Sequence, residues 1–83
     1  MGGLKKLTEQ GYMELNSMKQ KVFDVSRISD RGRLNLSRYE HLSARVNEMG
    51  EGYDVSIFVK FLDYHKGVYE MRKKEVSSFL QRA

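Results

Sequence analysis

The chain has 83 residues, 40% of them apolar and 31% charged, so it suits one small domain over residues 1–83 and is too short for a second independent core. It contains no cysteine, which excludes disulfides and thiolate metal sites. Fifteen Lys and Arg against eleven Asp and Glu give a net charge of +4, which mildly favours an anionic partner.

The apolar runs are too short for a membrane span. The longest run, Ile57–Val59, has three residues, whereas a spanning helix needs roughly 18. The first six residues contain neither a continuous apolar export region nor the Ser or Thr that a myristoylation signal requires at position 6. We therefore expect a cytoplasmic protein with no membrane partner.

Residues 1–30 show helical periodicity. Apolar residues recur at steps of three and four, which is the spacing of one helix face. This spacing predicts an N-terminal helix, whose stripe covers about three heptads and is near the minimum for pairing with another helix. The stripe consists of Leu4, Leu7, Gly11, Leu15, Met18, Val22 and Val25.

A short strand is predicted after the turn residues Asp30–Gly32. Polar and apolar residues alternate over Arg33–Ser37, and this period of two is typical of a strand. Side chains alternate between the two faces of a strand. One face would therefore carry Arg33, Asn35 and Ser37, and the other Leu34 and Leu36.

Three further helical stretches are predicted. Ser37 and Glu40 have the spacing of a capping box, which predicts a helix over 38–49 that stops at Gly50 and Gly52. Asp54 is expected to cap the next helix, and Gly67 to divide that helix from a closing helix over 68–83. The closing helix has Val76, Phe79 and Leu80 on one side.

Catalytic chemistry has little support in the sequence. The two histidines, His41 and His65, lie in separate predicted elements, and no cysteine accompanies them. A histidine-led nucleophile or a zinc site therefore lacks parts. The glycines do not match the spacing of a phosphate-binding loop. We predict a protein that is not an enzyme, with no catalytic residue, no metal and no cofactor.

Arginines are concentrated around the predicted strand. Arg27, Arg31, Arg33 and Arg38 fall within twelve positions. The planar guanidinium can bind a phosphate or a guanine edge through two hydrogen bonds, whereas lysine presents a point charge. The cluster therefore favours recognition of a nucleic acid.

The order of elements over residues 32–66 resembles the Arc/MetJ-type ribbon–helix–helix DNA-binding family. The resemblance consists of the strand Arg33–Ser37, the helix over 38–49, the turn Gly50–Gly52 and the helix from Asp54 onward. It implies a mainly α, dimeric fold with one short strand, to which residues 1–30 add an extra helix. In that family the strand pairs antiparallel with its copy in a second subunit, and the ribbon enters the major groove.

The resemblance implies a sequence-specific double-stranded DNA-binding homodimer, either a transcriptional repressor or a plasmid or phage accessory factor. Its implied base-facing residues are Arg33, Asn35 and Ser37, since Arg pairs with guanine and Asn with adenine. The implied phosphate contacts are Arg27, Arg31, Arg38 and Tyr53. The implied core and dimer residues are Leu34, Leu36, Leu42, Val46, Phe58, Phe61 and Leu62.

The alternative is an all-α bundle of three or four helices, in which residues 33–37 form a loop and the arginines are solvated. Such a chain would be a small helical protein–protein interaction or adaptor module that acts through its amphipathic helices. Its partner would then bind through the N-terminal helix.

Overall fold

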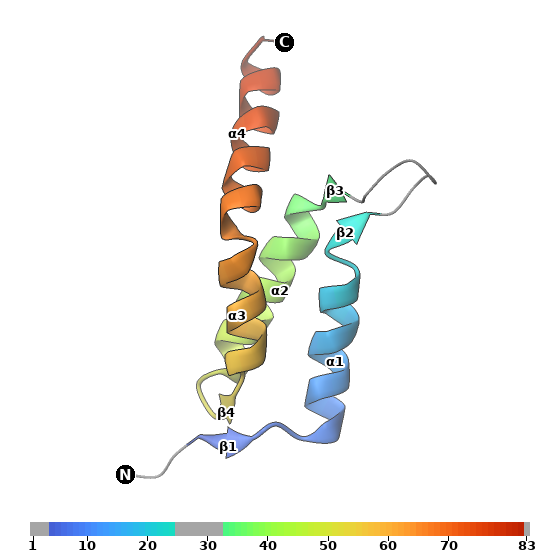
Figure 1. The fold of residues 1–83 in the computed structure, drawn as a ribbon, viewed down its shortest axis with the longest axis vertical. Helices are drawn as coiled ribbons and strands as arrows, with labels where there is room; N and C mark the ends of the chain where they lie inside the picture. The colour runs from blue at the N-terminus through green and yellow to red at the C-terminus, as the bar shows by residue number, and fades with distance from the viewer. Residues whose placement is uncertain (1–3, 25–32, 83) are drawn as a thin grey trace.

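The protein is mainly α-helical, as the sequence predicts. The computed structural model describes residues 4–24 and 33–82, and helices account for 73% of them (Figure 1). Arg27, Arg31 and the predicted turn at 30–32 lie outside the described residues. The helices are α1 Glu9–Gln20, α2 Leu36–Met49, α3 Ser56–Tyr64 and α4 Lys66–Arg82.

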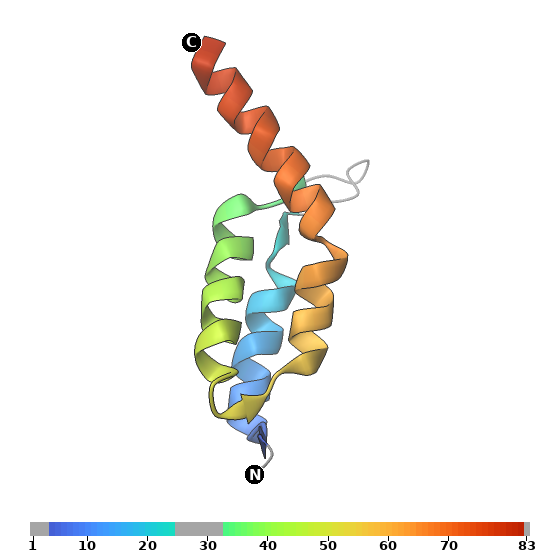
Figure 2. The same cartoon turned by 90° about the vertical axis from the view of Figure 1, so that its left-hand side faces the viewer.

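Two short strand pairs lie at opposite ends of the helical body (Figures 1 and 2). At one end β1 (Lys5–Lys6) pairs in parallel with β4 (Tyr53–Asp54). At the other end β2 (Phe23–Asp24) pairs antiparallel with β3 (Arg33–Leu34). The pairs therefore tie both ends of α1 to the segments that flank α2.

The predicted N-terminal helix is shorter than its periodicity indicates, so the prediction is wrong at both ends. The Thr8 side chain accepts a hydrogen bond of 3.0 Å from the Gly11 amide and starts α1 there. Leu7 and Val22 lie outside α1, yet Leu7 packs against the core and Val22 is fully buried. Extended residues at both ends of a helix can continue its apolar stripe, which is why spacing alone does not locate the ends.

The predicted strand over residues 33–37 is also wrong in extent. The strand includes only Arg33–Leu34, and these residues pair with β2 of the same chain. The Asn35 side chain accepts from the Arg38 amide at 3.0 Å, so Asn35 caps α2 and Ser37 falls within its first turn. The capping box predicted at Ser37 is therefore not the start of the helix.

The remaining helix boundaries agree with the sequence more closely. α2 ends at Met49 with Gly50 as its C-cap, as predicted. The N-cap of α3 is Val55 and not the predicted Asp54, one residue earlier; the Asp54 carboxylate accepts from the amide of Ser56, the first helical residue, at 3.1 Å and from its hydroxyl at 2.7 Å. The break between α3 and α4 falls at His65, two positions before the predicted divider Gly67, and Figure 2 shows α4 continuing beyond it.

The core forms where α1, α2 and α3 face one another. Five of the residues predicted as core are buried, and Leu36 and Phe61 are half-buried and pack against them. All seven therefore contribute to packing within a single chain. The buried apolar residues are Leu15, Val22, Leu34, Tyr39, Leu42, Val46, Val55, Phe58 and Leu62.

One buried hydroxyl satisfies the end of α3. The last carbonyls of a helix lack intrahelical partners, and the Tyr39 hydroxyl on α2 donates to the Leu62 carbonyl at 2.6 Å. The Tyr39 ring is buried in the core. This hydrogen bond attaches α3 to α2 close to the His65 break.

We expect Tyr39→Phe to lower the free energy of unfolding by about 1–3 kcal/mol, because it leaves a buried carbonyl without its donor. Urea denaturation followed by circular dichroism measures the change. Tyr64→Phe is the matched control, since Tyr64 is 83% exposed. Equal losses in the two variants would show that the Tyr39 hydroxyl contributes nothing specific.

Candidate interaction surface at the free end of α4

Two tyrosines attach the first turns of α4 to α2. The Tyr39 and Tyr69 rings stack with centroids 4.4 Å apart and planes 16° apart. The Tyr69 hydroxyl donates to the Glu40 carboxylate at 2.6 Å. This hydrogen bond raises the pKa of Tyr69, and burial followed by the charge of Asp63 raises the pKa of Tyr39.

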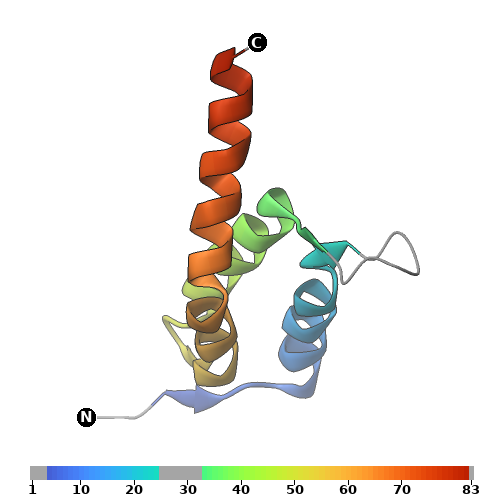
Figure 3. The ribbon, with the colours of Figure 1, turned by 45° about the horizontal axis from the view of Figure 1, so that its top comes forward.

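The face of α4 that packs on α2 continues past the N-terminal end of α2. Tyr69, Val76 and Leu80 are spaced seven and four residues apart, so they lie on one helix face. α4 has 17 residues, about 26 Å at the helical rise, and Figures 2 and 3 show its last turns extending past the start of α2. Tyr69 and Val76 are half-buried, whereas Leu80 is 66% exposed.

Further apolar side chains of α4 are exposed beside this face. Phe79 is 72% exposed and Met71 63% exposed, and Val68 is also exposed. Phe79 and Leu80 lie side by side in the last turns. Single exposed apolar residues are normal on a protein surface, but Phe79 and Leu80 are two neighbouring large apolar residues in the last turns of α4.

A groove runs between the start of α2 and the second half of α4. Its volume is about 520 Å³. Apolar side chains from both helices line it, together with the carboxylate of Glu40 and the ammonium group of Lys73. The lining residues are Leu36, Ser37, Glu40, Lys73, Val76, Ser77, Leu80 and Gln81. We call this groove, together with Phe79, the α4 surface.

The α4 surface lies on the most basic helix of the chain. α4 contains five Lys or Arg residues and two Glu, a formal net charge of +3. The Arg72 guanidinium lies 3.7 Å from the Glu75 carboxylate. Lys73 and Lys74 are both exposed.

The residues predicted to face DNA bases do not form a row on one strand. Arg33 is exposed on β3, Asn35 caps α2 and donates to Asp24 at 3.1 Å, and Ser37 lies in the first turn of α2. A reading edge needs side chains at alternate positions of one extended segment. The structure supplies that geometry for Arg33 alone.

The two predicted phosphate contacts that the structure describes, Arg38 and Tyr53, are also not brought together. Arg38 pairs with Asp24 at 2.9 Å and donates to the Lys21 carbonyl at 3.2 Å, near the start of α2. Tyr53 is half-buried on β4, past the end of the same helix. α2 has 14 residues, about 21 Å, so Arg38 and Tyr53 lie at opposite ends of the body.

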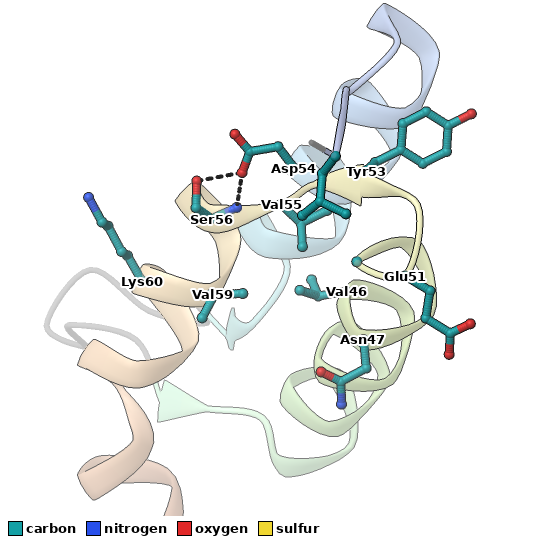
Figure 4. A pocket seen from close by; sticks show the side chains of 11 residues that line it. Val46, Asn47, Glu51, Tyr53, Asp54, Val55, Ser56, Val59 and Lys60 are labelled. Atoms are coloured by element: carbon teal, nitrogen blue, oxygen red, sulfur yellow. Dashed lines mark hydrogen bonds between the residues drawn. The ribbon is translucent and has the colours of Figure 1, made fainter. Parts of the chain in front are cut away.

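A second groove of about 560 Å³ lies at the other end of the molecule, between α2, β4 and α3. Figure 4 shows Val46, Val55 and Val59 in its middle, with Lys60 and Glu51 toward the rim. Its Asp54 carboxylate is already bonded to Ser56. Among the described residues, every buried polar side-chain atom has a hydrogen-bond partner.

Sequence reasoning located the apolar side of the closing helix but did not single it out as a site. The apolar spacing at 76, 79 and 80 is equally expected of a residue set that packs in the core. Phe79 and Leu80 differ from core residues in being exposed, because the last turns of α4 lie past the start of α2. No local pattern in the sequence shows where α4 lies relative to the start of α2.

The described residues contain no group of three or more His, Asp or Glu side chains arranged to hold a metal ion. Along residues 4–24 and 33–82, every helix falls short of the length or the apolar character that crossing a bilayer demands. Comparisons of the chain with protein-family models, with curated proteins and with solved structures found no match. The class that the fold defines is a mainly α-helical protein with two short strand pairs.

We expect stability to fall at alkaline pH through Tyr39 and Tyr69. Both pKa values are raised in the folded state, so the tyrosines stabilise the fold fully below the pKa of an unfolded tyrosine, about 10. This contribution is lost as the pH rises through the higher folded values. Urea denaturation measures the free energy of unfolding at about pH 8 and at about pH 11. Between these two pH values, this free energy should fall less for Tyr39→Phe/Tyr69→Phe than for the unchanged chain. An identical loss would contradict this assignment.

Proposed function

We propose that this chain is a small helical protein–protein interaction module that binds a partner polypeptide through the α4 surface. The observation that carries the proposal is the continuation of the packed face of α4 past the start of α2, which leaves Leu80 and Phe79 exposed. Burying one large apolar side chain contributes about 1.5–3 kcal/mol. A partner that covers both residues would therefore gain an anchor of the size found in interface hot spots.

The partner face expected from the sequence, the stripe of the N-terminal helix, is already used inside the chain. Leu15 and Val22 are fully buried, and Met18 packs against the core. The Glu14 carboxylate of α1 also accepts from the Arg45 guanidinium of α2 at 2.7 Å. These contacts support a structural role for the stripe and direct the proposal to α4.

We expect Phe79→Ser/Leu80→Ser to lower the free energy of unfolding by less than about 1 kcal/mol, because both side chains are exposed and each surface substitution usually alters stability by at most about 0.5 kcal/mol. Leu42→Ala should lower the free energy of unfolding by about 2–5 kcal/mol, since Leu42 is fully buried. Calorimetry compares the two. A large loss in the double variant would mean that the end of α4 belongs to the core.

Partner binding tests the proposed function. The full chain captures candidate proteins from an extract, and each candidate is then purified and titrated against the purified chain. Phe79→Ser/Leu80→Ser should weaken the binding by at least about tenfold, or about 1.4 kcal/mol. Met13→Ser is the matched control, because Met13 is 62% exposed on α1. If no candidate distinguishes the double variant from the Met13 control, the proposed function is wrong.

The second candidate function is the one that the resemblance implies: a homodimeric ribbon–helix–helix protein that reads duplex DNA. The net charge of +4 and the exposed Arg33 favour it. A strand over the whole of residues 33–37, paired between copies, would require the cap at Asn35 and the first turn of α2 to be lost. This cost makes the homodimer less favourable than protein binding through α4.

Titration of duplex DNA at two salt concentrations tests the second candidate. If Arg33 contacts a base, Arg33→Ala should relax discrimination between sequences by about 1–3 kcal/mol. A variant that only loses a phosphate contact should weaken all sequences alike and reduce the salt slope by about one. Negligible binding even at low salt, with only monomer in light scattering, would exclude this function.

A further inference from the structure

We infer that the partner segment is an acidic amphipathic helix, which lies in the groove between α2 and α4 with its apolar side on Val76, Phe79 and Leu80. This inference rests on the proposed function and adds the chemistry of the partner. The spacing of the three residues is that of one helix face. A helix with apolar residues at steps of three and four is the usual ligand of such a groove.

The charge of α4 argues for acidic flanks on the partner. The helix has a net charge of +3, and Lys73 lies at the rim of the groove. Its neighbour Lys74 is exposed. A partner with carboxylates beside its apolar stripe would meet these ammonium groups, and opposite charges across an interface fix its orientation and exclude wrong partners.

The opposite wall of the groove carries charge of both signs. It is formed by the first turn of α2, at Leu36 and Ser37, and the start of a helix carries a partial positive charge. The Glu40 carboxylate on this wall is negative, and the hydrogen bond that it accepts from the Tyr69 hydroxyl does not remove its charge. The preference for carboxylates on the partner therefore comes from Lys73 and Lys74 of α4.

A second copy of the chain and a lipid surface fit less well. Pairing α4 with α4 would bring together two helices that each have a net charge of +3. A membrane-bound helix needs an uninterrupted apolar face. Along the outer line of α4, Glu75 lies between Val68 and Phe79, seven residues after one and four before the other, which places a carboxylate in the middle of that face.

The test is a selection from a display library of helical peptides of about 16 residues, long enough to form a helix on binding, with randomised surface positions. The immobilised full chain selects binders, and the Phe79→Ser/Leu80→Ser chain removes those that bind elsewhere. We expect the retained peptides to be enriched in Asp and Glu beside an apolar stripe. Fluorescence anisotropy then measures the affinity of individual peptides.

We expect Lys73→Glu/Lys74→Glu to weaken peptide binding by about tenfold at low salt, and added salt to reduce this difference. Lys5→Glu/Lys60→Glu makes the same change in net charge at exposed positions on β1 and α3, and it should have little effect. Circular dichroism confirms that each variant is folded. Equal weakening by the two charge variants would overturn the inference, because only a general charge effect would remain.

The other outcomes separate this inference from the proposed function. If the retained peptides are neutral or basic, the inference of an acidic partner is wrong, while the proposed binding of a polypeptide by the α4 surface is not contradicted. No peptide sensitive to Phe79→Ser/Leu80→Ser would overturn both. A dimer in sedimentation that the double variant abolishes would assign the surface to a second copy. Sedimentation with phosphatidylserine vesicles that depends on Phe79 would assign it to lipid, and either result would overturn the inference.

Discussion

The course of the chain after α3 depends on Tyr39. Its hydroxyl bonds to the Leu62 carbonyl near the end of α3, and its ring stacks on Tyr69 near the start of α4. A single side chain of α2 therefore contacts both segments that flank the break at His65. Because Tyr39 lies in the second turn of α2, α4 meets α2 close to its N-terminal end. Within residues 4–24 and 33–82, the last turns of α4 extend past the start of α2, and Phe79 and Leu80 are exposed there.

This arrangement allows an exposed helix without loss of the core. The fully buried side chains Leu15, Leu42 and Phe58 come from α1, α2 and α3, and α4 contributes none of the buried residues. The strand pairs close the two ends of the body, and the Arg45–Glu14 pair joins α1 to α2 at the surface. An exposed ion pair of this kind contributes little to stability, so the apolar core has the main role. The last turns of α4 are therefore available for a contact outside the chain.

The sequence predicted what depends on local patterns and missed what depends on distant contacts. The course and C-terminal end of α2, and the buried positions Leu42, Val46 and Phe58, follow from periodicity and glycine. The start of α2 does not, since Asn35 and Ser37 are equally good caps by composition. Asp24, eleven residues away, bonds both Asn35 and Arg38. This contact favours Asn35 as the cap and shortens the strand to two residues.

The same contact changes how the basic residues are interpreted. Four arginines close to a predicted strand favour recognition of a nucleic acid, but one of them, Arg38, pairs with Asp24 and bonds to the Lys21 carbonyl near the start of α2. The exposed lysines at 73 and 74 instead lie on the helix whose apolar residues are also exposed. Apolar surface supplies affinity and the flanking charges supply selectivity. The combination of both on one projecting helix is the ground on which we propose an acidic amphipathic helix as the partner.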